Sequence, residues 1–203
     1  AVSSNVNYEL KIFLYASAAT RHYGDLKTEI ENDGFPVDCV MDNLILGDSG
    51  YVMAKTTGLA IVDVSNYFER LKPNYVVTVG DRFETMAVAV ASSYMGLPLI
   101  HTMGGEITGT LDEAIRHSIT KLANVHFVSN KNAFDVVRKL GEDPRFIFNV
   151  GCPRIDVIRS VVNKKEIEHD LSNYGEGENI NIESDEFIMI SQHAVTTEYS
   201  TLE

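Results

Sequence analysis

The sequence predicts an α/β protein built on a parallel, Rossmann-like sheet. Five short apolar runs recur along it, and each is mostly continuous rather than alternating: KIFLYAS, NYVVTVGD, LPLIHTMGG, VHFVSN and FIFNVGCP. Continuous hydrophobicity over 4–8 residues is typical of strands buried on both faces. Segments with helical periodicity separate the runs, and this alternation favours a doubly wound domain with right-handed crossovers.

The expected helices span roughly 50–72, 83–95, 111–124 and 131–140. The first places Ala60, Ile61, Val64, Tyr67 and Phe68 at helical spacing on one face. A further helix is expected at about 155–171, after the VGCP motif.

Composition changes after that helix. The stretch SNYGEGENINIESDE is rich in glycine, asparagine and acids and has no apolar period, which is typical of a linker. We therefore expect an N-terminal Rossmann-like domain over 1–172, a linker over 173–186, and the start of a second, truncated domain over 187–203, where FIMISQHAVTT resembles a strand. The chain begins with Ala1 and stops soon after that run, so both ends look cut.

Charge and cysteine content restrict the class of protein. The 203 residues carry a formal net charge of -12, which disfavours nucleic acid and anionic membranes as partners. Cys39 and Cys152 are far apart and fit no metal or redox spacing, which favours the cytosol. No run approaches the roughly 18 apolar residues of a membrane span, and no signal peptide opens the chain.

Ligands of open parallel sheets bind beyond the carboxyl ends of the strands, so charged residues that directly follow strands are the first candidates. Asp81 and Arg82 follow NYVVTVG, Glu106 follows LPLIHTMGG, and His193 follows FIMISQ. Gly104 and Gly105 precede Glu106 and would let the backbone approach a ligand closely.

Helix capping is the competing interpretation of these acids. Asp81 and Glu84 have the spacing of a capping box, and so do Thr110 and Glu113. Asp112 would then lie in a first helical turn, where a carboxylate suits the helix dipole. This makes Glu113 a structural residue and leaves Asp112 open.

Two basic residues follow on the same predicted helix. Arg116 lies four residues after Asp112, where the simplest interpretation is a solvated ion pair. His117 points about 100° away and could be a structural histidine.

Neither a GxGxxG nor a GxxxxGK[ST] motif is present, and no metal spacing occurs, which disfavours dinucleotide oxidoreduction and P-loop chemistry. Asp81, Glu106 and Asp112 at one end of one sheet would suit general acid/base chemistry on a carbon substrate.

The motifs GDRFE, GGEITGTLDEAIRHSITKLANVHF, VGCPR and QHAVTTE resemble those of the hydrolysing UDP-N-acetylglucosamine 2-epimerases of sialic-acid-type sugar synthesis. The resemblance runs from about Asp33 to Glu198 and implies two Rossmann-like domains in the glycosyltransferase-B arrangement. It also implies anti elimination of UDP and the 2-proton, followed by hydration of the glycal to N-acetylmannosamine. No redox cofactor or metal is implied, and family members commonly form homo-oligomers.

The resemblance implies catalytic roles for Asp81, Glu106, Asp112 and His193. Glu106 and Asp112 are expected to transfer protons, while Asp81 would hold the sugar or aid departure of the leaving group. Arg82, Gly104, Gly105, Arg116 and His117 are expected to support the substrate. The family's Gly-Thr-Arg-Ala-Asp-Tyr type loop does not precede NYELKIF, and Ala194 and Cys152 also depart from its pattern.

Three alternatives remain open. The same chemistry could act on a UDP-diacetamido-trideoxy sugar, or the protein could be a non-hydrolysing epimerase, whose HGDT and HRREN-type motifs this chain lacks. It could also be a catalytically silent module that binds sugar nucleotides.

Overall fold

The computed structural model describes residues 2–162 together with residues 186, 188 and 190, and these group into two compact units, 1–150 and 151–203. The predicted linker at 173–186 falls outside the described residues except for Glu186, and the predicted strand at 187–197 except for residues 188 and 190. Among the described residues, no helix is long and apolar enough to cross a membrane.

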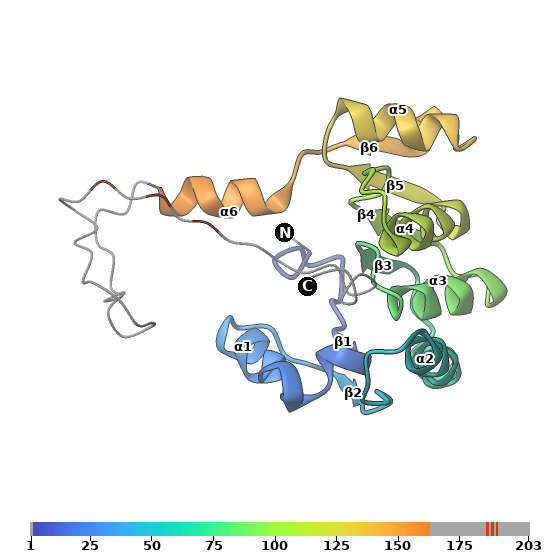
Figure 1. Ribbon diagram of the computed structural model, residues 1–203. Helices are drawn as coiled ribbons and strands as arrows, with labels where there is room; N and C mark the ends of the chain where they lie inside the picture. The colour runs from blue at the N-terminus through green and yellow to red at the C-terminus, as the bar shows by residue number, and fades with distance from the viewer. Residues whose placement is uncertain (1, 163–185, 187, 189, 191–203) are drawn as a thin grey trace. The chain divides into compact units, whose positions relative to one another are not determined.

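The first unit holds two parallel sheets (Figure 1). One pairs β1 (Phe13–Tyr15) with β2 (Cys39–Met41), and the other has the order β3-β4-β5-β6. Its strands are Val76–Val79, Leu99–Thr102, Val125–Val128 and Ile147–Asn149. All four predicted runs from NYVVTVGD onwards, and KIFLYAS before them, therefore contain a strand.

The helices alternate with the strands as predicted. They are α1 (Leu26–Asn32), α2 (Gly50–Leu71), α3 (Thr85–Tyr94), α4 (Leu111–Leu122) and α5 (Lys131–Lys139). Short 3-10 turns occur at Ala16–Ala18, Arg21–Tyr23 and Pro144–Phe146. The α/β class with parallel strands is confirmed.

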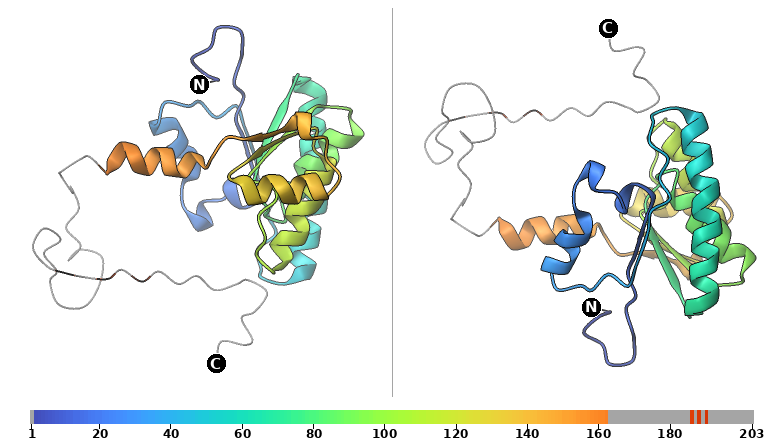
Figure 2. Two further views of the ribbon diagram at one scale, coloured as in Figure 1. Left: turned by 90° about the horizontal axis from the view of Figure 1, so that it is seen from above. Right: turned by 90° about the horizontal axis from the view of Figure 1, so that it is seen from below.

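Strand order decides which face each helix covers. The strands β3 to β6 advance in one direction, so right-handed crossovers place α3, α4 and α5 on one face. Figures 1 and 2 show these helices together with α2 on one side of the strands and α1 on the other. The chain thus reverses its winding between β1 and β3, and such a switch point is where open α/β sheets bind ligands.

One core joins the two sheets. Val64 and Phe68 of α2, Val88 of α3, Leu99 of β4 and Ile119 of α4 are almost fully buried in it. Phe13 and Tyr15 of β1 pack against the same cluster, so β1 lies over the core that supports β3.

The expectation that the strands are buried on both faces is wrong for β3. Val76 and Thr78 are buried, whereas Val77 and Val79 are 58% and 66% exposed. The helices that follow β3, β4 and β5 all lie on one face, and no described element covers these two valines on the other.

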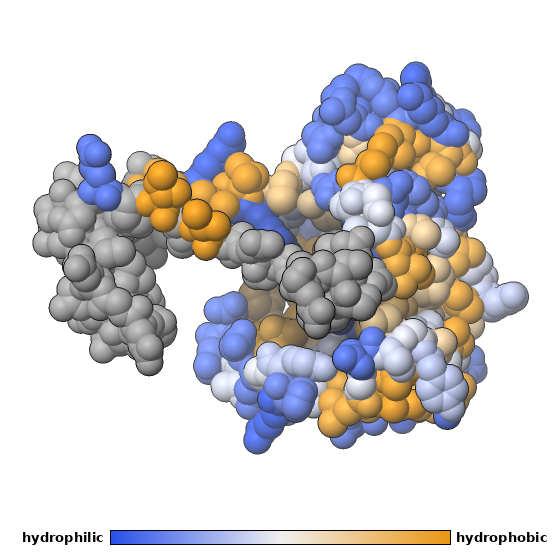
Figure 3. Space-filling model, in the orientation of Figure 1, coloured by the Kyte–Doolittle hydropathy of each residue, from blue (hydrophilic) through white to orange (hydrophobic). Residues whose placement is uncertain are grey.

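The second unit begins with α6 (Pro153–Val161), which coincides with the start of the helix predicted at 155–171. Ile155, Val157 and Ile158 on it are exposed, and Figure 3 shows apolar side chains along this helix.

Candidate active site at the carboxyl ends of the strands

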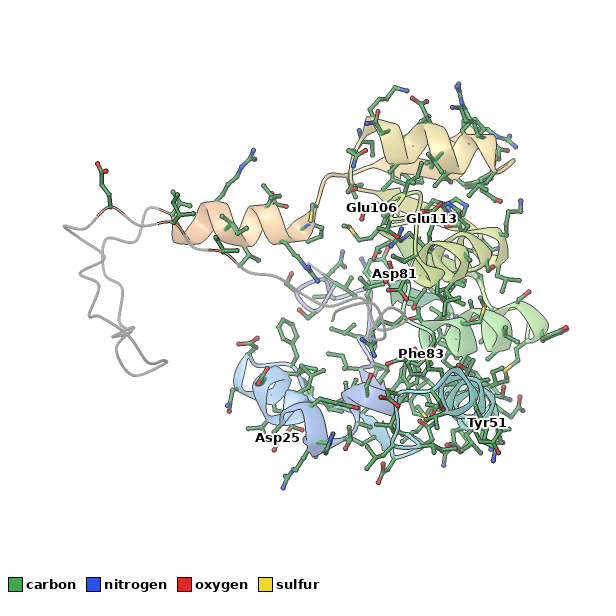
Figure 4. The ribbon with its side chains drawn as sticks, in the orientation of Figure 1. Asp25, Tyr51, Asp81, Phe83, Glu106 and Glu113 are labelled. Carbon is green, nitrogen blue, oxygen red and sulfur yellow. The ribbon has the colours of Figure 1, made fainter. Side chains whose placement is uncertain are left out.

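The predicted acids gather where β3, β4 and β5 end. Asp81 and Arg82 follow β3 after Gly80, whose φ of +77° suits glycine, and Glu106 comes four residues after the end of β4. Figure 4 shows Asp81 and Glu106 at the same edge, beside the start of α4. Neighbouring parallel strands end at one edge, so residues far apart in sequence meet there.

Arg116 of α4 holds this edge together. Its side chain is 4% exposed, one guanidinium nitrogen donates to Asp81 Oδ2, and another donates to the backbone oxygen of Glu106. The expectation of a solvated pair with Asp112 is therefore wrong. Arg116 binds two groups of the protein rather than pairing with Asp112 in solvent. Its planar guanidinium can bridge two acceptors at once.

The capping interpretation of Asp81 is also wrong. The helix α3 begins at Thr85, and its capping residue Glu84 makes no side-chain capping bond. The carboxylate of Asp81 instead meets Arg116, 35 residues along the chain. This leaves Asp81 as a charged group of the site rather than a helix cap.

Glu106 is oriented by a residue that the sequence analysis missed. Ser129 directly follows β5, and its hydroxyl donates to Glu106 Oε1 at 2.8 Å. The rule that selected Asp81, a polar residue just beyond a strand, would also have selected Ser129. Ser129 was not selected because only charged residues after strands were considered as candidates.

Asp112 lies in the first turn of α4 and has a raised pKa. The main cause is burial, and the negative charge of Asp81 adds to it, while Arg82 and Arg116 oppose it. A carboxyl group whose pKa is raised toward neutrality can hold and release a proton more readily at physiological pH.

Glu113 is structural, as predicted, although its partners differ from those of a capping box. Its Oε2 accepts from the backbone N–H groups of Thr108 and Gly109 at 2.7 and 2.6 Å. These bonds, that of Gly109 first, lower the pKa of the Glu113 carboxyl. The turn that presents Glu106 and Asp112 is thereby fixed to the start of α4.

Gly104 and Gly105 were expected to make room for a ligand, but the space beside them is filled by protein. A Cβ on Gly105 would lie 2.4 Å from the backbone oxygen of Ala133, and one on Gly104 would lie 2.9 Å from Thr120 Oγ1. Gly105 also has a φ of +84°. Both glycines thus allow the end of β4 to pack against α4 and α5.

His101 of β4, for which no role was predicted, lies beneath the site. It is fully buried, with Nε2 2.9 Å from the Gly80 oxygen and Nδ1 3.1 Å from Thr120 Oγ1. Burial is the main cause that lowers its pKa to about 4. A neutral ring that donates from Nε2 to the Gly80 oxygen connects β3 and β4, and the contact with Thr120 adds α4.

The remaining predicted residues differ in position. Arg82 is largely exposed and donates from Nε to Glu84 at 3.0 Å. His117 places Nε2 3.6 Å from Glu113 Oε1. His193 lies outside the described residues, so its role stays a prediction. Among the described residues, no group of three or more histidine, cysteine or acidic side chains is arranged to hold a metal ion.

A family model described as UDP-N-acetylglucosamine 2-epimerase matches residues 1–202. The chain belongs to the UDP-N-acetylglucosamine 2-epimerase family. This agrees with the resemblance seen in its motifs.

Curated relatives carry related names. The GDP/UDP-N,N'-diacetylbacillosamine 2-epimerase (hydrolyzing) of Campylobacter jejuni is 34% identical over 173 residues, which cover 84% of this chain and 45% of the relative. The UDP-N,N'-diacetylbacillosamine 2-epimerase (hydrolyzing) of Legionella pneumophila is 35% identical over 67% of this chain and 36% of the relative. The chain therefore spans less than half the length of these relatives.

Solved structures share the fold. The UDP-GlcNAc 2-epimerase of Neisseria meningitidis bound to UDP-GlcNAc has a TM-score of 0.68 at 19% identity, covering 80% of this chain and 44% of that chain. The MnaA–UDP structure of S. aureus has a TM-score of 0.64 at 20% identity, covering 77% of this chain and 42% of that chain. The predicted relationship to the glycosyltransferase-B type is confirmed at the level of fold.

Proposed function

We propose that this chain supplies the acid/base half of a hydrolysing 2-epimerase that converts UDP-N-acetylglucosamine to N-acetylmannosamine and UDP. The supporting observation is the meeting of Asp81, Glu106 and Asp112 at one sheet edge in a member of the 2-epimerase family. At that edge Arg116 donates hydrogen bonds to Asp81 and to the backbone of Glu106, and Asp112 lies in the first turn of α4.

The proposed reaction has two steps. In the first, a carboxylate removes the proton from C2, the C1–O bond breaks, and its electron pair leaves on the β-phosphate oxygen of UDP. In the second, water adds its oxygen to C1 of the resulting 2-acetamidoglucal while C2 regains a proton on the opposite face. Each step needs a group that exchanges one proton, which matches carboxyl side chains.

We assign proton transfer to Glu106 and Asp112. Glu106 is oriented by Ser129. Because its pKa is raised, Asp112 is protonated more readily than an exposed aspartate. Asp81 is paired with Arg116 and is assigned to holding the sugar. His193 is proposed to act from the second domain.

Two of the relatives support a second candidate substrate. The Campylobacter and Legionella proteins are named as hydrolyzing 2-epimerases of nucleotide-linked N,N'-diacetylbacillosamine. Their identities exceed the 29% of the UDP-N-acetylglucosamine 2-epimerase of Neisseria meningitidis. The same carboxyl groups would serve either sugar, since both reactions break bonds at C1 and C2.

The test is to express the protein from its complete gene and to measure UDP release from each of the two UDP-sugars. A higher kcat/KM for UDP-N-acetylglucosamine supports the proposal, and a higher value for the diacetamido sugar supports the second candidate. Binding of UDP without turnover of either sugar would contradict both and indicate a silent binding module.

We also propose a cytosolic homo-oligomer. Cys39 and Cys152 are free thiols, which suits a reducing compartment. Sedimentation that gives only a monomer at high protein concentration would contradict the oligomer.

A further inference from the structure

Glu84 is a buried acid to which the proposed mechanism gives no part. It is 5% exposed and is the one buried acidic residue among those the structure describes. Its Oε1 accepts from the hydroxyl of Ser17 and from Nε of Arg82. Its Oε2 is also buried and has no hydrogen-bond partner among the described residues.

A buried carboxylate oxygen without a partner is unfavourable. Buried polar atoms in proteins are nearly always hydrogen-bonded, and a charged group left unpaired costs more than a neutral one. Ser17 and Arg82 both bind the same oxygen, so they orient the carboxylate and leave the second oxygen without a partner among the described residues.

Glu84 lies at the end of the sheet where open α/β proteins bind ligands. Ser17 follows β1 and Glu84 follows β3, so their contact spans the point at which the winding of the sheet reverses. Glu84 is also three residues from Asp81, and its charge is one of those that raise the pKa of Asp112. It therefore lies within electrostatic reach of the acid cluster.

We propose that Oε2 of Glu84 accepts a hydrogen bond from a hydroxyl group of the sugar, and that Glu84 is a specificity-determining residue of this site. Ser17 and Arg82 act as positioning residues that hold the carboxylate toward the sugar. The inference rests on the proposed function, because it takes a UDP-linked sugar as the ligand.

The test compares the wild type with Glu84→Gln in the protein expressed from its complete gene. Affinities for UDP-N-acetylglucosamine and for UDP are measured by calorimetry with Asp112→Asn present in both proteins, since the proposed function predicts that this change prevents turnover during the titration. Hydrogen bonds to charged groups are among the stronger ones, so we expect UDP-sugar to bind roughly 10- to 100-fold more weakly to the variant. UDP lacks the hydroxyls of the N-acetylglucosamine ring, so its affinity should be unchanged.

Three substrate analogues, each lacking the 3-, 4- or 6-hydroxyl, identify the donor. The analogue that lacks the hydroxyl bound by Glu84 should lose no further affinity in Glu84→Gln, since the two changes remove the same interaction. Additive losses for all three analogues would overturn the proposal.

Glu142→Gln is the matched control. Glu142 is a partly buried acid before β6, at the opposite end of the strands, where it contacts Lys121 and His126. Its replacement should leave the ratio of UDP-sugar to UDP affinity unchanged, whatever it does to the melting temperature. An equal loss of both affinities in Glu84→Gln would show a merely structural role and overturn the proposal.

Turnover by the wild type separates this inference from the proposed function. If the wild type binds UDP-sugar without turnover, the enzyme assignment fails, while the affinity ratios still decide the role of Glu84. If the wild type binds no UDP-sugar, both are contradicted.

Discussion

Arg116 makes the contacts on which the arrangement of the acids most depends. Its buried guanidinium bonds to Asp81 and to the backbone of Glu106. Breaking a buried ion pair leaves the remaining charge uncompensated and costs more than the pair contributes.

We predict that Arg116→Met lowers the free energy of unfolding by roughly 2–4 kcal/mol, because the Asp81 carboxylate loses its ion-pair partner. The double variant with Asp81→Asn should recover part of this loss without recovering turnover. Urea denaturation measures the stability. A double variant as unstable as the sum of the two single variants would contradict the coupling.

Ser129 gives a milder test of how Glu106 is oriented. We predict that Ser129→Ala lowers kcat about tenfold, since one hydrogen bond to a charged group is lost. Ser118→Ala is the control, because the Ser118 hydroxyl only donates to the Ala114 oxygen within α4. Equal rates for the two variants would show that Ser129 does not orient Glu106.

The helices and strands around the site pack closely where the end of β4 meets α5. Gly105 and Gly109 share a positive φ, +84° and +73°, but only Gly105 lies against other atoms. The two positions therefore separate backbone strain from steric overlap.

Gly109→Ala should cost about 1 kcal/mol from its backbone conformation alone. Gly105→Ala should cost roughly 3 kcal/mol or more, because its Cβ would lie 2.4 Å from the Ala133 oxygen. Thermal unfolding of the two variants checks the difference. Similar losses would mean that α5 moves away from β4 at little cost.

Most elements were predictable because apolar periodicity marks them. The helix α2 buries Ala60, Val64 and Phe68 on one face, and it coincides with the predicted range to within a residue. By contrast, neither α1 nor β2 has a buried residue, so neither left a pattern to detect.

The candidate site was predictable only in part. The acids were found because each follows a strand or starts a helix, which is local information. The bond from Arg116 to Asp81 joins residues 35 apart, and the rule for residues i and i+4 pointed instead to Asp112. The contacts of Ser17 with Glu84 and of Ser129 with Glu106 also join loops that follow different strands, so local spacing did not indicate them.

For the molecule as a whole, buried histidines connect stability to pH. Burial lowers the pKa of His101 to about 4 in the folded state, below the ordinary value of 6.5. The unfolded chain therefore binds a proton that the folded chain does not, between these two values. Stability from this group is complete above pH 6.5 and is lost as the pH falls toward 4.

We predict that His101→Gln unfolds with a weaker pH dependence between pH 6.5 and 4, the difference from the wild type amounting to roughly 1–3 kcal/mol over that range. Glutamine retains a donor and an acceptor but does not titrate in this range. Urea denaturation at several pH values measures the free energy of unfolding. The same dependence on pH in the two proteins would contradict the prediction.

We propose that Glu106 and Asp112 exchange the proton at C2 of the sugar. The direct measurement is NMR of the products formed in D2O from UDP-N-acetylglucosamine by the protein expressed from its complete gene, with Glu106→Gln and Asp112→Asn assayed beside it. Free N-acetylmannosamine carrying deuterium at C2, formed by the wild type and by neither variant, is the predicted result. Product without deuterium at C2, or unchanged turnover in both variants, would contradict the claim.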